Sequence, residues 1–246
     1  MTVVVTRPGS AGLELTTMLE KNNIAAIHFP LFTFTDGEEL HLLTHHLDNL
    51  TKDDWVFPVS TQAIEFAHKE LQRLNKNWPT DIKYLAVGKK SAEKLCSLTK
   101  QKILYPSQQE NSEGLIKLLN KQELHTQKIL ILRAENGREL FSDFLHNRGT
   151  EVITLCCYNR KPIIYNKLRA FKNLVSPVIF IVTSQTNLIA LHQLLVDNHF
   201  QYSNTILITV SARIALIAKQ LGWKNIQICE KVNNQILYNT VQSIIR

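Results

Sequence analysis

The sequence predicts an α/β fold built from doubly wound parallel sheets, and two observations lead to this prediction. Short apolar runs of strand type alternate with amphipathic helical patterns along the 246 residues, which is typical of parallel sheets with helices on both faces. The two halves of the chain also echo each other at an offset of about 123 to 126 residues. Repeated strand–helix units on this scale predict two similar domains.

The apolar runs predict strands at residues 2–6, 54–59, 83–87, 102–104, 129–132, 178–183, 205–210 and 226–229. Two extended aromatic segments, 28–35 and 154–162, break the alternation, and the repeat places Phe32 of the first opposite Tyr158 of the second. We expect these segments to be paired connectors between the domains. Parallel sheets bind ligands beyond the carboxyl ends of their strands, so a ligand cleft between two such edges is expected.

The repeat places the same residue types at equivalent strand ends. Arg7 and Arg133 each end a strand, and Ser60 and Ser184 each lie at a strand-to-helix turn. Residues 85–88 are equivalent to residues 208–211, and a short helical pattern follows each. The alternative is that the echoes arise by chance, because strand–helix units resemble one another.

Composition limits the classes of function. Twenty-eight Lys and Arg against 21 Asp and Glu give a net charge of +7, which favours an anionic partner. The basic residues form no continuous stripe, so the sequence does not indicate nucleic-acid binding. The longest apolar run, Val178 to Val182, is too short for a membrane span, and the N-terminus does not read as a secretory signal, so we expect a cytoplasmic protein. The four cysteines form no disulfide framework and no metal pattern, and we expect reduced thiols.

Ordered short motifs resemble those of the uroporphyrinogen-III synthases over almost the whole chain. They are Val5-Thr6-Arg7-Pro8, Ser60, Ala86-Val87-Gly88 with Ser91-Ala92, residues 112–115, residues 129–133, Tyr158-Asn159-Arg160 and Val182-Thr183-Ser184. The resemblance implies two flavodoxin-like α/β domains joined by a two-stranded connector. The first would be discontinuous, residues 1–34 plus 162–246, the second would span 38–154, and the connector strands would be 29–37 and 155–162.

The resemblance also implies a reaction. Hydroxymethylbilane, a polycarboxylate linear tetrapyrrole, would be cyclised to uroporphyrinogen III with loss of water and inversion of ring D through a spiro intermediate. Unassisted closure gives the symmetric isomer, so catalysis would act chiefly by orientation, and no cofactor is expected. The enzyme that supplies the unstable substrate is a candidate partner, and we expect a monomer.

One catalytic and seven substrate-binding candidates follow. Tyr158 matches the family's connector tyrosine and would give a proton to the departing hydroxyl; its plain alternative is a half-buried strand aromatic. The binding candidates are Arg7, Ser60, Thr61, Ser91, Arg133, Ser184 and Gln185. For the three serines the alternative is helix capping, and for the arginines it is surface salt bridges. Thr61 and Gln185 stand where the family usually has proline, and residues 211–214 also depart from its pattern.

Three further sequence features resemble ligand sites or helix signals and have simple structural interpretations. Residues 88–91 lack the first glycine of a phosphate loop, and three histidines, His41, His45 and His46, are expected on a solvated helix face. Residues 107–110 form a capping-box pattern and predict the start of a helix. The rival functions are a non-catalytic two-lobed cytoplasmic binding protein for a small anionic ligand and a repeat-built interaction module.

Overall fold

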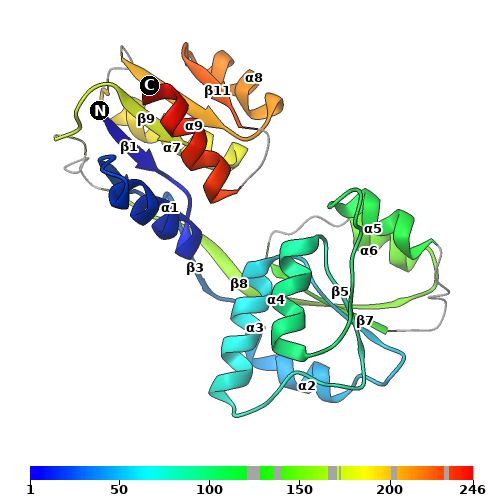
Figure 1. Ribbon diagram of the computed structural model, residues 1–246. Coiled ribbons are helices and arrows are strands. Elements are labelled where there is room, and N and C mark those ends of the chain that lie inside the picture. The colour runs from blue at the N-terminus through cyan, green and yellow to red at the C-terminus, as the bar shows by residue number, and fades with distance from the viewer. Residues whose placement is uncertain are drawn as a thin grey trace. The chain divides into compact units, whose positions relative to one another are not determined.

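The computed structural model describes residues 1–120, 128–135, 140–165, 171, 173–200, 204–229 and 233–245. The chain divides into two compact units, which are described separately. Unit 1 consists of Met1–Thr33 and Lys161–Arg246, and unit 2 of Phe34–Arg160. The chain therefore crosses from one unit to the other within two strands, β3 (Phe32–Asp36) and β8 (Glu151–Pro162), as Figure 1 shows.

Unit 2 contains a six-stranded sheet with the order β3-β8-β7-β4-β5-β6. Its other strands are β7 (Lys128–Ala134), β4 (Trp55–Pro58), β5 (Lys83–Leu85) and β6 (Ile103–Leu104). The described helices are η1 (Leu40–Leu42), α2 (Leu43–Asp48), α3 (Thr61–Arg73), α4 (Lys89–Thr99), α5 (Ser112–Leu119) and α6 (Leu140–His146). Strands β8, β7, β4, β5 and β6 pair in parallel, whereas the bonds Gly37 N–H to Cys157 O and Ile163 N–H to Leu31 O make β3 antiparallel to β8.

Strand alternation gives the unit 2 sheet two apolar faces. Val56 and Leu130 point into a core shared with α2, α3 and α4, while Phe57 and Ile131 point into a second core with α5 and α6. Successive side chains of a strand face opposite sides, so continuous apolar runs bury on both faces and helices must cover each one. Figure 1 shows the unit 2 helices arranged in this way.

Unit 1 contains a five-stranded parallel sheet with the order β11-β10-β9-β1-β2. The strands are β11 (Ile226–Ile228), β10 (Thr205–Thr209), β9 (Val178–Ile181), β1 (Thr2–Val5) and β2 (Ala26–His28). The described helices are α1 (Gly9–Lys21), α7 (Gln185–Asp197), α8 (Ala212–Gln220) and α9 (Asn234–Ile245). Val4 and Phe180 face the core under α7 and α8, and Val5 and Ile181 face the core under α1 and α9.

The strand orders confirm the predicted repeat. Read from the opposite edge, the unit 2 order β6-β5-β4-β7-β8 matches β11-β10-β9-β1-β2 of unit 1 strand for strand. Each predicted strand is present, with ends that differ by one or two residues. The α/β fold with doubly wound, mainly parallel sheets is therefore confirmed.

The capping-box prediction at residues 107–110 is wrong. Helix α5 begins at Ser112, and its N-cap is Asn111, whose side chain accepts a hydrogen bond from Gly114 N–H at 2.9 Å. Glu110, the acidic residue of the predicted box, instead accepts from Lys89 N–H at the start of α4. A contact between residues 21 positions apart has displaced the local one.

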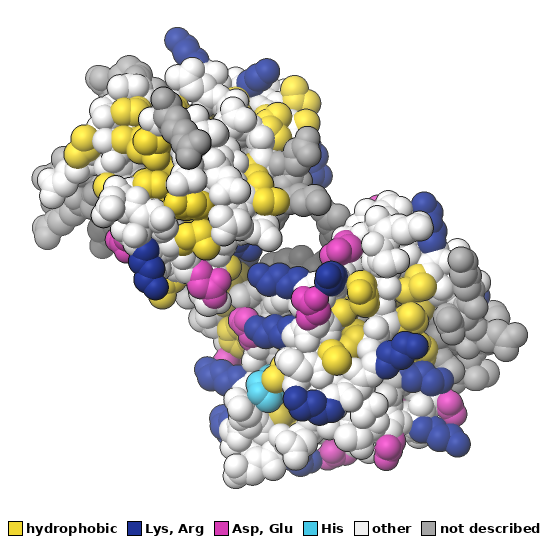
Figure 2. Space-filling model, in the orientation of Figure 1, with side chains coloured by type: hydrophobic (Ala, Val, Ile, Leu, Met, Phe, Trp, Pro, Cys, Tyr) yellow, Lys and Arg dark blue, Asp and Glu magenta, His cyan; other side chains and the backbone are white. Residues whose placement is uncertain are grey.

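On the face seen in Figure 2, Lys and Arg side chains are interspersed with acidic, apolar and uncharged ones. Among the described helices, none has both the length and the apolar character needed to cross a bilayer.

Asp54 joins the start of β4 to the start of β7. Its buried carboxylate accepts hydrogen bonds from Thr51 N–H at 2.7 Å, Thr51 Oγ1 at 2.9 Å and Lys128 N–H at 2.8 Å. Burial alone would raise the pKa of Asp54, but these hydrogen bonds hold it below its ordinary value of 3.8. A carboxylate with a lowered pKa stabilises the fold above its unfolded-state pKa, and the contribution is lost as the pH falls through the folded-state value.

We therefore expect Asp54→Asn to lower the free energy of unfolding by about 1–3 kcal/mol at neutral pH, because an amide cannot accept all three hydrogen bonds. The difference from wild type should shrink below the ordinary Asp pKa, as followed by urea unfolding across pH. Asp53→Asn is the matched control, since its side chain is exposed and pairs with Lys83 only at 3.4 Å. Equal effects at the two positions would contradict the role given to Asp54.

Candidate active site

Ser60 lies at the turn between β4 and α3, where the sequence predicts a hydroxyl at a strand end. Its backbone is extended (φ −159°, ψ 164°), and its Oγ accepts a hydrogen bond from Ala63 N–H at 3.1 Å. Ser60 is therefore the N-cap of α3, as the helix-capping alternative predicts. The same oxygen lies 3.2 Å from Tyr158 Oη, so the structure brings two predicted site residues into contact.

A β-bulge aims Tyr158 at Ser60. Strands β7 and β8 pair regularly as far as Arg133 and Cys156, but the next pair is Ala134 with Tyr158. Regular alternation would place Cys157 and Tyr158 on opposite faces of the sheet. With the extra residue, Cys157 belongs to the core beneath α3 and Tyr158 packs against that same core.

Two aromatic rings hold the Tyr158 ring. Phe66 of α3 stacks on it with centroids 5.5 Å apart and an interplanar angle of 18°, and Phe34 of β3 meets it edge-on at 5.7 Å and 80°. Burial raises the pKa of Tyr158, and the hydrogen bond with Ser60 partly opposes that rise. The phenol therefore keeps its proton at neutral pH and is available as a proton donor.

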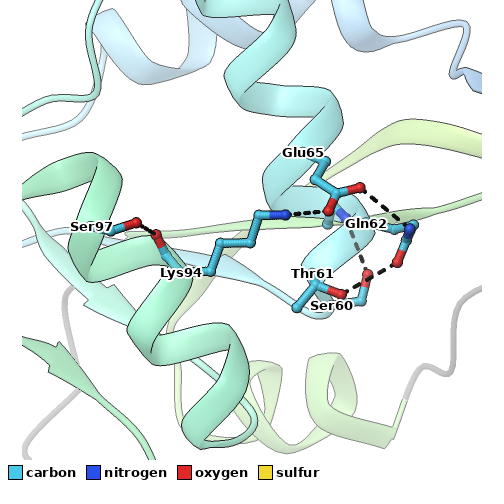
Figure 3. A network of polar contacts seen from close by, with 7 residues as sticks. Ser60, Thr61, Gln62, Glu65, Lys94 and Ser97 are labelled. Atoms are coloured by element: carbon cyan, nitrogen blue, oxygen red, sulfur yellow. Dashed lines mark hydrogen bonds and ion pairs between the residues drawn. The ribbon is translucent and has the colours of Figure 1, made fainter. Parts of the chain in front are cut away.

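A chain of polar contacts runs from the first turn of α3 to α4 (Figure 3). Thr61 Oγ1 donates to Gln62 Oε1 at 3.3 Å, and Gln62 Nε2 donates to Glu65 Oε2 at 3.4 Å. Glu65 Oε1 forms an ion pair with Lys94 Nζ. Because Thr61 directs its hydrogen to Gln62, its hydroxyl offers a lone pair to a ligand, and Lys94 already has an anionic partner.

Ser91 is a buried residue in the first turn of α4 and does not cap that helix. The N-cap is Gly88, and the predicted capping alternative for Ser91 is wrong. Glu110 Oε2 takes the hydrogen bond of Lys89 N–H at 3.0 Å and packs so closely that a Cβ on Gly88 would lie 2.2 Å from it. A carboxylate of the chain itself thus occupies this helix N-terminus, and a substrate contact of Ser91 stays a prediction.

In unit 1, Ser184 repeats the geometry of Ser60. It caps α7 by accepting from Asn187 N–H at 3.2 Å, and Gln185 follows as an exposed first residue of the helix. Asn187 Nδ2 reaches Thr6 O at 3.3 Å and so links α7 to the residue after β1. The capping role predicted as the alternative for Ser184 is confirmed.

Arg7 follows β1 and is held by the last helix of the chain. Its Nη1 donates to Asn234 Oδ1 at 2.6 Å, and Asn234 Nδ2 donates to Ala11 O at 3.0 Å. Burial lowers the pKa of the Arg7 guanidinium, and Glu14 partly offsets this. The partner that positions Arg7 is thus a neutral amide rather than the predicted surface salt bridge, and the guanidinium keeps its charge for an anion.

Arg133 is the second-last residue of β7 in unit 2, half-buried and in register with Cys156. Its predicted position at a strand end is confirmed.

Sequence reasoning missed Phe66 and Asn234, which touch Tyr158 and Arg7. Phe66 lies on the apolar face of an amphipathic helix and carried no signal beyond ordinary packing. Within the described ranges, no group of three His, Cys, Asp or Glu side chains is placed to hold a metal ion.

Comparison with known proteins gives one consistent family. The model of the family described as "Uroporphyrinogen-III synthase HemD" matches residues 14–239. The uroporphyrinogen-III synthase of Escherichia coli (strain K12) is 34% identical over 246 residues, with 98% of this chain and 100% of the relative covered. The uroporphyrinogen-III synthase of Salmonella typhimurium (strain LT2) is 35% identical over 248 residues, with 98% and 100% covered.

Solved structures agree in fold. The crystal structure of uroporphyrinogen-III synthetase from Helicobacter pylori matches with a TM-score of 0.63 at 17% identity, covering 99% of this chain and 98% of that one. A mutant uroporphyrinogen III synthase from Thermus thermophilus matches with a TM-score of 0.61 at 14% identity, covering 100% and 99%. At these identities the likeness supports the two-sheet α/β architecture.

Gly12 sets how closely α1 approaches the loop that carries Arg7. A Cβ at this position would lie 1.9 Å from Arg7 O and 2.5 Å from His28 Nε2, two atoms that are themselves 2.9 Å apart. We expect Gly12→Ala to lower the free energy of unfolding by at least about 2 kcal/mol in urea, because a backbone carbonyl must move. Leu13→Ala, at a neighbouring position that is 57% exposed, should change it by less than about 0.5 kcal/mol. Wild-type stability of Gly12→Ala would contradict this packing.

Proposed function

The chain belongs to the uroporphyrinogen-III synthase family, and from this membership we propose how its residues serve the reaction. The activity is that of a hydro-lyase of tetrapyrrole biosynthesis. Hydroxymethylbilane is cyclised to uroporphyrinogen III with loss of water and inversion of ring D through a spiro intermediate. The sequence match over nearly the whole chain carries this assignment.

Tyr158 is the proton donor for the departing hydroxyl in this proposal. Loss of water from the ring A hydroxymethyl group needs a proton on the leaving oxygen, and a phenol that stays protonated can supply it. The raised pKa of Tyr158, caused first by burial, favours the protonated form. The two aromatic contacts of Tyr158 fix its oxygen at the carboxyl-end edge of the unit 2 sheet.

The other candidates bind substrate carboxylates. Ser60 and Ser184 each cap a helix whose N-terminal amides and dipole favour an anion. Thr61 and Gln185 are the first residues of these helices and contribute backbone N–H groups there. Arg7 and Arg133 supply guanidinium groups that can pair with carboxylates bidentately, and Ser91 completes the proposed set.

We also propose that the protein works in the cytoplasm. All four cysteines are free thiols, which suits a reducing compartment. The substrate's several carboxylates suit a chain with a formal charge of +7.

Tyr158→Phe is expected to lower the rate of uroporphyrinogen III formation by at least about 100-fold, because it removes the acid and leaves the ring packing intact. The assay incubates the protein with freshly prepared hydroxymethylbilane, oxidises the products and resolves isomers I and III by chromatography. Tyr105→Phe, another partly buried tyrosine on the same core, should keep normal turnover. Normal turnover by Tyr158→Phe would remove Tyr158 from the chemistry, and isomer I alone from wild type, at the rate without protein, would reject the synthase.

Asn234→Asp tests the proposed anion site at Arg7. An aspartate there would pair with the Arg7 guanidinium and compete with a substrate carboxylate, so KM should rise about tenfold while kcat changes little. Asn239→Asp makes the same charge change on an exposed face of the same helix and should leave KM unchanged. An unchanged KM in Asn234→Asp would argue against a carboxylate at Arg7.

A further inference from the structure

The Ser60 hydroxyl makes two contacts, one with a backbone N–H group and one with a phenol. A hydroxyl has one hydrogen and two acceptor lone pairs. Ala63 N–H occupies one lone pair of Ser60 Oγ at 3.1 Å, and Tyr158 Oη lies 3.2 Å away. Because the contact with Ala63 uses only one lone pair, the Ser60 hydrogen remains available for donation to Tyr158.

Among the described residues, the N-cap serines Ser184 and Ser211 show no such second contact. Ser184 Oγ and Ser211 Oγ accept from Asn187 N–H at 3.2 Å and Ile214 N–H at 3.3 Å, in nearly the same extended backbone conformation as Ser60. Within the part of the chain that the structure describes, neither of these hydroxyls meets a phenol. Helix capping therefore explains the backbone contacts of all three serines but leaves the contact of Ser60 with Tyr158 unexplained.

We propose that Ser60 is a positioning residue that donates its hydroxyl hydrogen to Tyr158 Oη, so that Tyr158 keeps its own hydrogen for the leaving hydroxyl of the substrate. This inference rests on the proposed role of Tyr158 as the acid. The opposite orientation, with Tyr158 donating to Ser60, would use up the proton that the reaction needs. The N-terminus of α3 favours the proposed orientation, because its positive end strengthens Ser60 as a donor.

In this proposal Tyr158 gives up one proton in the reaction and later takes one back. The C–O bond of the hydroxymethyl group breaks with its electron pair on oxygen, that oxygen takes the Tyr158 proton, and water leaves. Tyr158 becomes a phenolate, whose charge is stabilised by the hydrogen bond from Ser60 Oγ. When ring D has attacked and the substrate loses a proton to restore its aromatic rings, the phenolate accepts that proton. The rings of Phe66 and Phe34 hold Tyr158 Oη in place throughout.

Two substitutions at Ser60 separate the hydrogen bond from the helix cap. Glycine is a good N-cap residue without a hydroxyl, and threonine keeps both the cap and the hydroxyl. Because the N-terminal amides of α3 that would meet a substrate carboxylate remain, Ser60→Gly is expected to lower kcat at least about tenfold with little change in KM. Ser60→Thr is expected to keep most of the wild-type kcat. In Ser60→Gly the pKa of Tyr158 should also rise, which shifts the basic limb of the kcat/KM profile to higher pH.

Carbon-13 NMR of ring-labelled tyrosine measures that pKa without any substrate, and Tyr158→Phe assigns the resonance. Ser211→Gly removes a comparable capping hydroxyl in unit 1 and should leave kcat, KM and the Tyr158 resonance as in wild type. An unchanged kcat and Tyr158 pKa in Ser60→Gly, with Tyr158→Phe inactive, would overturn this inference and leave the proposed function standing. A fully active Tyr158→Phe would overturn the proposed acid itself.

Discussion

The hydrogen bond between Ser60 Oγ and Tyr158 Oη joins residues 98 positions apart and depends on the whole architecture of unit 2. Ser60 follows β4, Tyr158 lies on β8, and β7 separates the two strands in the sheet. Neighbouring strands are about 4.8 Å apart, so the side chains of Ser60 and Tyr158 together have to bridge roughly 10 Å between β4 and β8. A tyrosine side chain aimed by a bulge, with a helix beginning on the same side of the sheet, meets this requirement.

Much of this arrangement could be predicted because local sequence patterns indicate it. Apolar runs of strand length predicted the strands, and the internal repeat predicted two similar domains, in which the structure shows one shared strand order. Ser60 and Ser184 were predictable as helix caps because a serine at a strand-to-helix turn accepts a backbone N–H three residues on. The catalytic candidate Tyr158 came from the family resemblance, since an aromatic residue on a strand is ordinarily only a packing residue.

The rest depends on contacts that no local pattern encodes. The bulge at Cys157 changes which face Tyr158 occupies, and a period of two along the strand would assign it wrongly. Glu110 caps α4 from 21 residues away instead of starting its own helix, and Asn234 reaches Arg7 across 227 positions. These hydrogen-bond partners are determined by the tertiary fold. A capping motif or an arginine at a strand end therefore identifies a candidate residue but does not predict which group it contacts.

The sequence repeat agrees with a proposed acid that lies in unit 2 alone. The repeat makes Phe32 of unit 1 the counterpart of Tyr158, and Ser184 the counterpart of Ser60. Both units therefore keep a serine-capped helix at the carboxyl end of a buried strand, a feature suited to holding an anion. In the sequence repeat the two positions differ by a single oxygen, and the ring of phenylalanine has no proton to give up. If Tyr158 acts as proposed, its hydroxyl adds proton transfer in unit 2 to a helix N-terminus of a kind that both units share.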